Sequence, residues 1–171
     1  MEDEILNSEL LLKAGKTAQT LMEKLKEKSA TLALSESCTA GLISALLACI
    51  PGSSNVLWGS FVCYTREAKK SMLGIDGTEL DAAGLVSEKT AVFMASSALK
   101  KSGADYSASV TGLAGPDGDG SSVPVGTVWT AVAGKNGVIV SKEHHFKDSR
   151  NDVRLKAAIS VFESILSFMG G

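Results

Sequence analysis

The stretch that decides the fold is residues 31–52, which read TLALSESCTAGLISALLACIPG. Its apolar start, residues 31–34, predicts a short buried strand, and the small polar residues 35–39 predict a tight loop. Residues 40–49 predict a helix, which Pro51-Gly52 ends. A strand, a tight loop and a helix in immediate succession are typical of an α/β domain. In such domains ligands bind outside the carboxyl ends of the strands.

Helices and strands alternate on both sides of this stretch. Residues 5–28 place apolar side chains at three- and four-residue steps with lysines between them, which predicts an amphipathic helix. Beyond residue 52 the patterns predict a strand over 55–64, a helix over 67–73, a helix over 87–103, strands over 106–111, 127–133 and 138–144, and a helix over 151–168. We therefore expect an α/β fold, a single three-layer α/β/α domain with a mixed central sheet, over residues 1–171 with its core at about 30–168.

Composition narrows the class of protein. The 171 residues are 44% hydrophobic and 21% charged, which is too apolar for a disordered chain, and the net charge of −2 argues against binding nucleic acid by bulk charge. Cys38, Cys49 and Cys63 are odd in number and form no C-x-x-C pair, so we expect reduced thiols and no structural zinc. The acidic start is no signal peptide, and no apolar run is long enough to span a membrane. These features predict a cytoplasmic protein.

The loop at residues 35–41 is the first candidate site. Ser37, Cys38 and Thr39 each carry a potential nucleophile, and the amides from Thr39 to Gly41, with the small Ala40 between them, could hold an oxyanion at the start of the following helix. The same residues also fit an ordinary helix N-cap.

A second candidate lies in residues 64–69, where a strand runs into a helix. A lysine whose pKa is lowered by burial can serve as the base for a serine nucleophile, and Lys69 with Tyr64 could supply such a group. An exposed helix start with solvated charges is the alternative for this segment.

The third candidate is the glycine-dense loop 111–127, in which Thr111, Gly112, Ala114, Gly115, Gly126 and Thr127 could surround a phosphate or carboxylate with backbone amides. It matches neither a Walker phosphate loop nor a dinucleotide fingerprint, so a phosphotransferase is disfavoured. Asp117 and Asp119 resemble the start of a calcium loop, but no closing glutamate follows. A plain surface loop remains the alternative.

Two arginines form the fourth candidate. Arg150 and Arg154 are four residues apart at the head of the last helix, so they share one face and could bind a phosphate, or simply be solvated. His144 and His145 are adjacent on a predicted strand, so at most one of them could face Ser37 in a triad.

Together these segments resemble the CinA C-terminal family, the PncC-type nicotinamide-nucleotide amidases. The similarity covers roughly residues 10–168, in the family's order and spacing. The motifs that carry it lie at residues 34–41 (LSESCTAG), 50–54 (IPGSS), 59–69, 84–88 (GLVSE), 102–105 (SGAD), 110–116 (VTGLAGP) and 124–129 (PVGTVW).

The resemblance implies an enzyme that hydrolyses the carboxamide of nicotinamide mononucleotide to nicotinic acid mononucleotide and ammonia. It places the nucleophile on Ser37 and its partners on Tyr64 and Lys69. We expect no metal and no cofactor, and a phosphate site at the glycine-rich loop, Arg150 or Arg154. The rival hypothesis is a non-catalytic nucleotide-binding or interaction module associated with competence or DNA damage.

The chain departs from the family pattern at a few positions. Ala40 replaces the usual glycine, Arg66 replaces an asparagine and was therefore predicted to contact the substrate, and Asp119 and Val123 stand where glycine and lysine are usual. The length leaves no room for the second, N-terminal domain of some members, so the chain resembles the stand-alone form. Apolar helices at both ends make a homodimer the expected oligomer.

Overall fold

The computed structural model describes residues 6–170. Its elements are α1 (Ser8–Glu27), β1 (Leu32–Glu36), α2 (Leu42–Ala48), a short 3₁₀ turn (Ser53–Asn55), β2 (Leu57–Val62), α3 (Arg66–Leu73), α4 (Gly77–Ala83), α5 (Glu88–Ser102), β3 (Tyr106–Gly112), β4 (Thr127–Gly134), β5 (Ile139–His145) and α6 (Arg150–Gly170). Every predicted helix and strand is present, and α4 is additional. The predicted start of the first helix at Ile5 lies outside the described residues.

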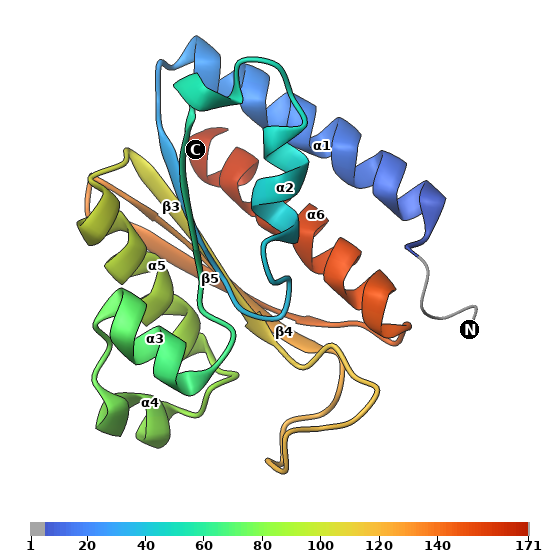
Figure 1. The fold of residues 1–171 in the computed structure, drawn as a ribbon. Coiled ribbons are helices and arrows are strands. Elements are labelled where there is room, and N and C mark those ends of the chain that lie inside the picture. Colours follow the sequence, from blue (N-terminus) through green and yellow to red (C-terminus); the bar gives the residue numbers. More distant parts are fainter. Residues whose placement is uncertain (1–5, 171) are drawn as a thin grey trace.

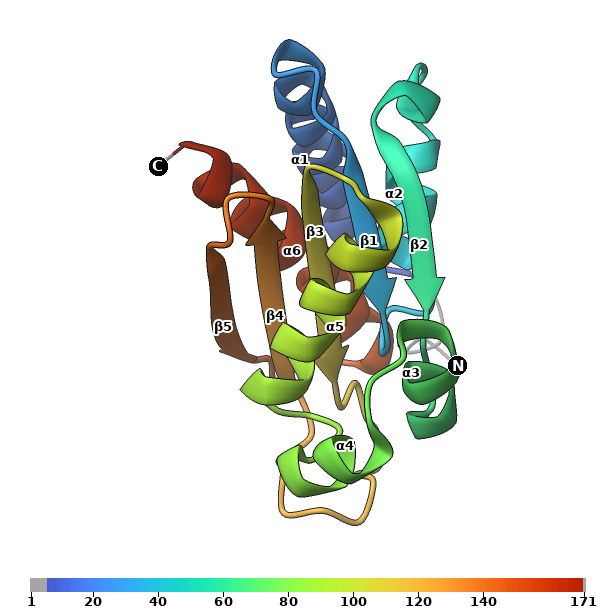
Figure 2. The ribbon, with the colours of Figure 1, turned by 90° about the vertical axis from the view of Figure 1, so that its left-hand side faces the viewer.

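The five strands form one mixed sheet in the order β2-β1-β3-β4-β5. The strands β2, β1 and β3 are parallel, whereas β4 pairs antiparallel with both β3 and β5. Helices α1, α2 and α6 lie on one side of the sheet, and α3, α4 and α5 lie on the other (Figures 1 and 2). This arrangement confirms the expected α/β fold with a mixed central sheet between two helical layers.

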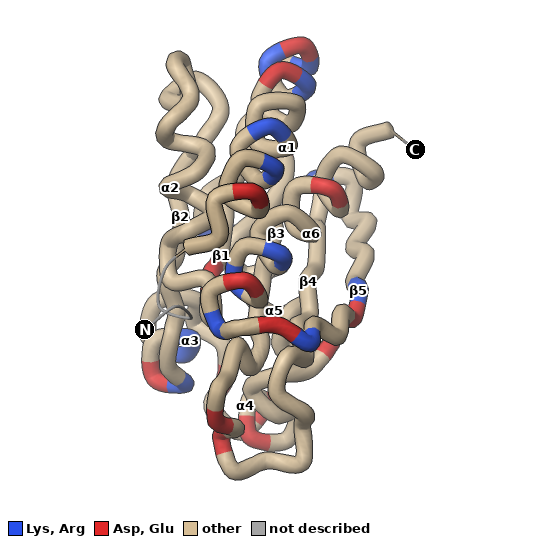
Figure 3. The backbone as a smooth tube through the Cα atoms, turned by 90° about the vertical axis from the view of Figure 1, so that its right-hand side faces the viewer, with Lys and Arg blue, Asp and Glu red and all other residues tan. Residues whose placement is uncertain are grey.

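The larger part of the core lies between the sheet and the layer of α1, α2 and α6. The predicted stripe of α1 is correct, because Ala14, Ala18, Leu21 and Leu25 are fully buried. Asn7 caps this helix by accepting hydrogen bonds from the amides of Glu9 and Leu10. Charges of both signs band the outer side of α1 (Figure 3). Over residues 6–170, no helix is long and apolar enough to cross a membrane.

Strand β1 is longer than predicted. It continues through Ser35 and Glu36, which the sequence analysis placed in a polar loop, and both residues are fully buried. The physical reason is that β1 is central, so β2 and β3 pair its backbone from both sides. The nucleophile candidate Ser37 is therefore the first residue after a rigid strand.

Helix α4 was missed because it carries no amphipathic pattern. It has seven residues, begins with Gly77, and buries only Gly77 and Leu80. Its stability at the N-terminus comes from Asp76, whose carboxylate accepts hydrogen bonds from the amides of Thr78 and Glu79.

The edge strand β2 contains a bulge. Leu57 pairs with Leu32, but the next pair is Gly59 with Ala33, so Trp58 is an extra residue on β2. A tryptophan in a strand is usually part of the core, but Trp58 is 50% exposed and stacks on Phe61 with ring centroids 5.5 Å apart. Beyond the bulge the pairing is regular up to Glu36 and Val62.

Candidate active site

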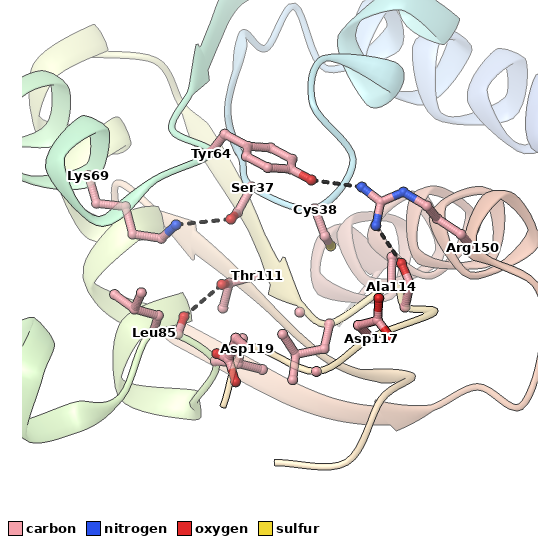
Figure 4. A pocket seen from close by; sticks show the side chains of 15 residues that line it. Ser37, Cys38, Tyr64, Lys69, Leu85, Thr111, Ala114, Asp117, Asp119 and Arg150 are labelled. Carbon is pink, nitrogen blue, oxygen red and sulfur yellow. Dashed lines mark hydrogen bonds between the residues drawn. The ribbon is translucent and has the colours of Figure 1, made fainter. Parts of the chain in front are cut away.

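The carboxyl ends of the three parallel strands surround a cavity of about 220 Å³. Ser37 follows β1, Tyr64 follows β2, and the loop after β3 forms the opposite wall (Figure 4). The cavity is lined by Ser37, Cys38, Tyr64, Lys69, Leu85, Val86, Thr111, Gly112, Leu113, Ala114, Gly115, Asp117, Gly118, Asp119 and Arg150. Its position is where open α/β sheets bind their ligands.

Ser37 and Lys69 are in direct contact in this cavity. The Lys69 Nζ atom lies 2.9 Å from the Ser37 Oγ atom, and it also donates to the Cys63 carbonyl oxygen at 2.9 Å (Figure 4). Lys69 sits one turn into α3, whose first turn is fixed by the Thr65 hydroxyl accepting from the Ala68 amide. The local fold thus points an amine at the serine hydroxyl.

Burial favours the neutral form of the Lys69 amine, which can accept a proton, more than exposure does for an ordinary lysine. Its side chain is 1% exposed, and loss of solvation lowers the pKa of its amine, against a smaller opposing effect of the Cys63 and Cys38 thiols. No carboxylate among the described residues forms an ion pair with it. A neutral amine beside a serine hydroxyl can accept the hydroxyl proton.

The other two nucleophile candidates of the loop are poorly suited to attack. Burial raises the pKa of the Cys38 thiol to about 12, so this residue stays protonated near neutral pH. Thr39 is fully buried, and its hydroxyl donates to a Glu36 carboxylate oxygen at 2.8 Å. Ser37 is the one candidate of the three that lines the cavity and has its hydroxyl in contact with the buried amine of Lys69.

The amides at the start of α2 do not face the cavity. Those of Gly41, Ile43 and Ser44 donate to the Glu36 carboxylate, and that of Ala40 donates to the Ser37 carbonyl. Ala40 and Gly41 therefore differ from the prediction, since neither lines the cavity and neither amide is available to an oxyanion. The amides of Cys38 and Thr39 make no backbone–backbone hydrogen bond among the described residues. Thr39 is fully buried and does not line the cavity, which differs from its predicted contact with the substrate, so of these two residues only Cys38 lies in the cavity wall.

Arg150 and Tyr64 meet at the mouth of the cavity. Arg150 donates from Nη1 to the Gly115 carbonyl at 2.5 Å and from Nη2 to the Tyr64 hydroxyl oxygen at 2.8 Å (Figure 4). Lys69 contacts Ser37 directly, so the tyrosine is not a relay between them. Because a guanidinium has five N–H donors, Arg150 keeps donors for an anionic ligand.

The structure does not bring Arg66 or Arg154 into the cavity. The Arg66 guanidinium turns toward α4, where it forms two hydrogen bonds with Asp81 at 2.6 and 2.7 Å and a third with the Gly77 carbonyl. Arg154 donates to the Thr39 carbonyl at 2.9 Å, behind the nucleophile loop. Both predicted substrate contacts are replaced by contacts within the protein.

One part of the glycine-rich loop lines the cavity, and another part closes the base of the loop. Thr111, Gly112, Ala114 and Gly115 line the cavity, and the Thr111 hydroxyl donates to the Leu85 carbonyl at 2.8 Å. Gly126 and Thr127 do not line it. Their amides close the base of the loop through hydrogen bonds to the carbonyls of Leu113 and Pro124, respectively.

The glycine at position 126 is required by the backbone. Its φ is +88°, and an added Cβ would lie 1.9 Å from the Phe146 carbonyl oxygen. Only glycine tolerates both conditions.

Among the residues that the structure describes, neither the histidine pair nor a metal-binding group of side chains lies in this cavity. Neither His144 nor His145 lines it, and the His144 ring lies against the Thr130 hydroxyl, 3.1 Å from Nε2. Over residues 6–170, no three His, Cys, Asp or Glu side chains are grouped so as to hold a metal ion.

Several lining residues were not among those expected to contact the substrate or to take part in catalysis: Leu85, Val86, Leu113, Asp117, Gly118 and Asp119. Leu85 and Val86 lie in an irregular segment between α4 and α5, for which the sequence offers no periodic signal. Asp117 and Asp119 could have been inferred, because they belong to the same loop as the predicted lining residues.

The comparisons with known proteins agree with one another. The family model "CinA C-terminal domain" matches residues 14–169. The chain is 41% identical over 142 residues to the nicotinamide-nucleotide amidohydrolase PncC of Enterobacter agglomerans, covering 83% of this chain and 87% of that protein. It is 38% identical over 159 residues to the PncC of Escherichia coli K12, covering 93% and 94%.

Longer relatives and a solved structure match as well. A CinA-like protein of Geotalea uraniireducens is 42% identical over 151 residues, which are 88% of this chain but 36% of that protein, so the chain spans about a third of it. The crystal structure of a competence/damage-inducible protein from Agrobacterium tumefaciens superposes with a TM-score of 0.89 at 33% identity, covering 98% of this chain and 99% of that one. The chain therefore belongs to the CinA C-terminal domain family.

Proposed function

We propose that this chain is an amidohydrolase that converts nicotinamide mononucleotide into nicotinic acid mononucleotide and ammonia. Two PncC relatives that it matches over most of their length are named nicotinamide-nucleotide amidohydrolases. The observation that carries the proposal is the 2.9 Å contact between Lys69 Nζ and Ser37 Oγ, with the lysine 1% exposed. A non-catalytic binding module has no need for a desolvated amine held against a serine hydroxyl.

Acylation begins at Ser37. Its oxygen forms a bond to the carboxamide carbon while its proton passes to Lys69 Nζ. The carbon–nitrogen bond then breaks, Lys69 returns the proton to the departing nitrogen, and ammonia leaves. The Cys38 amide, next to Ser37 in the cavity wall and without a backbone–backbone hydrogen bond, is the donor we assign to the negative oxygen of the tetrahedral intermediate.

Deacylation uses the same base. Water attacks the acyl carbon and gives its proton to Lys69, and the bond to Ser37 Oγ breaks as that oxygen takes the proton back. The product is a carboxylic acid, which loses its remaining proton to solvent and leaves as a carboxylate. Each proton transfer runs through Lys69, so no metal-bound water is required.

The charges of the cavity orient the substrate. Asp117 and Asp119 lie in the wall made by the glycine-rich loop, whereas Arg150 is at the mouth beside Tyr64. Carboxylates repel a phosphate, so we place the 5′-phosphate toward Arg150 and not against the glycine-rich loop. The aspartates then face the positively charged pyridinium ring or the ribose hydroxyls.

The direct test is release of ammonia from nicotinamide mononucleotide in the presence of EDTA. The wild type should turn over, Ser37→Ala should not, and Ser107→Ala should match the wild type. Ser107 is a suitable control because it is a buried serine on β3 whose hydroxyl bonds to the Ala95 carbonyl, outside the cavity. A folded wild type that releases no ammonia would refute the proposed substrate, and an active Ser37→Ala would refute the nucleophile.

We also propose that residues 1–171 act as one domain and as a homodimer in the cytoplasm. The three cysteines are free, which fits a reducing compartment. Light scattering after size-exclusion chromatography should give twice the mass of one chain, and a monomer active at the same concentration would refute the dimer.

A further inference from the structure

The residue that precedes the nucleophile is a buried carboxylate with an unusual number of partners. Glu36 is fully buried, yet no Lys, Arg or His side chain among the described residues forms an ion pair with it. Its side chain accepts five hydrogen bonds instead. Burial of a carboxylate is costly unless such bonds compensate for the lost water, so this arrangement needs an explanation.

The five donors come from three places in the fold. Oε2 accepts from the Thr39 hydroxyl at 2.8 Å and from the amides of Gly41 and Ile43, both at 3.0 Å. Oε1 accepts from the Ser44 amide and from the Ser60 hydroxyl on β2, both at 3.0 Å. One side chain therefore ties β1, the loop after it, the first turn of α2 and the edge strand together.

The loop that Glu36 holds has a backbone that needs support. Ala40 has φ +51° and Gly41 has φ +90°, two successive left-handed residues. A left-handed conformation is unfavourable for alanine, and the amide of Gly41 is held by Glu36. From the other side, Arg154 holds the Thr39 carbonyl.

The carboxylate also decides which amides face the substrate. By occupying the amides of Gly41, Ile43 and Ser44, it removes the start of α2 as an anion site. The Cys38 residue, beside Ser37 in the cavity wall, has an amide that makes no backbone–backbone hydrogen bond and that Glu36 does not occupy. Glu36 therefore anchors the backbone on the side of Ser37 that leads into α2.

We propose that Glu36 is a positioning residue, which sets the Ser37–Cys38–Thr39 arc so that Ser37 Oγ meets Lys69 Nζ. It does not touch the reacting atoms itself. This inference rests on the proposed serine chemistry, but not on the identity of the substrate.

The test is labelling by a fluorophosphonate probe, which reports on Ser37 without the natural substrate. Ser37 Oγ bonds to phosphorus, fluoride leaves, and the hydroxyl proton passes to Lys69. In Glu36→Gln the amide nitrogen cannot accept the hydrogen bonds that one carboxylate oxygen accepts. A displacement of about 1 Å can lower a rate by about 10²-fold, so we expect a fall of that order in the labelling rate constant.

Controls separate positioning from general damage. Ser107→Ala removes a buried hydrogen bond elsewhere and should label within about twofold of the wild type. Ser60→Ala removes one of the five donors without leaving a buried charge unpartnered, and it should lower the rate by about threefold to tenfold even if Glu36→Gln does not fold. For nicotinamide mononucleotide, Glu36→Gln should lower kcat and leave KM near the wild-type value.

The outcomes are distinguishable. Folded Glu36→Gln and Ser60→Ala proteins that label as fast as the wild type would overturn the proposal, and so would a wild type that is never labelled at Ser37. A wild type that is labelled at Ser37 but does not hydrolyse nicotinamide mononucleotide would refute the proposed substrate and leave the role of Glu36 standing.

Discussion

Replacing Lys69 with methionine separates the chemistry from the stability of the fold. Methionine has nearly the same length and stays apolar where the lysine amine is buried. The change removes the hydrogen bonds of Nζ with Ser37 Oγ and the Cys63 carbonyl, and Nζ forms no ion pair among the described residues. The exposed neighbour Lys70, on the same helix, gives a matched control in Lys70→Met.

The expected loss of rate is large. A positioned general base contributes about 10²–10⁴-fold, which corresponds to about 2.7–5.4 kcal/mol in the activation free energy. The fold should survive. The Cys63 carbonyl loses its donor at a cost of about 1–3 kcal/mol, but the desolvation of a buried amine disappears and offsets part of this.

The assay measures kcat by ammonia release and the free energy of unfolding by urea titration, on the wild type and both variants. Lys70→Met should match the wild type in both quantities. The reasoning would be refuted if Lys69→Met were folded and kept more than about a tenth of the wild-type kcat, because the 2.9 Å contact would then not be the route of the proton.

Three further predictions follow from the same geometry. Burial lowers the pKa of Lys69 below its usual 10.5, so kcat/KM should rise with pH and level off before pH 10.5. Between its lowered pKa and 10.5, Lys69 should contribute a rise in the unfolding free energy of up to about 1.4 kcal/mol per pH unit, since the unfolded chain binds a proton that the folded one does not. The raised pKa values of the Cys38 and Cys63 thiols act in the opposite direction in both the wild type and Lys69→Met, so the difference between the two proteins is measured. Urea titrations should find the Lys69 contribution missing in Lys69→Met. Gly126→Ala should destabilise the fold by at least about 2 kcal/mol, whereas Gly118→Ala, with open space around it, should change stability by under about 0.5 kcal/mol; thermal melts compare them. Arg66→Ala should keep kcat/KM within about twofold and change the melting temperature little, because its partner Asp81 is exposed; a large rise in KM would contradict this.

Hydrophobic periodicity in the sequence was sufficient to predict most of the helices and strands. The amphipathic α1, the hairpin of β4 and β5, and the strand–loop–helix around Ser37 all follow from local patterns. Helix α4 could not be found in this way, because it is short and buries little. The exposure of Trp58 was also invisible, since it depends on a bulge and on β2 being an edge strand.

The candidate site was predictable in its chemistry but not in all its contacts. Ser37 directly follows β1 and Lys69 lies one turn into α3. The strand-to-helix pattern made both residues candidates beside ordinary structural roles, and the family resemblance assigned their chemistry. The direction of a long side chain is different, since it depends on partners distant in sequence. Arg66 donates hydrogen bonds to Asp81, and Arg154 donates one to the Thr39 carbonyl, 115 residues away in the sequence. One signal was available for Glu36: an acid that ends an apolar strand before a helix can accept from the free amides of that helix.

The bulge at Trp58 also sets the pairing register of the residues that follow it on β2. Because one residue is looped out, Val62 pairs with Glu36, and the Cys63 amide donates to the Glu36 carbonyl at 2.7 Å. The same pairing fixes the position of the Cys63 carbonyl, which accepts a hydrogen bond from Lys69 Nζ. Without the extra residue the strand would slip by one position, and alternate side chains would exchange faces. The single extra residue of the edge strand therefore sets the register that places the Lys69 amine beside the Ser37 hydroxyl.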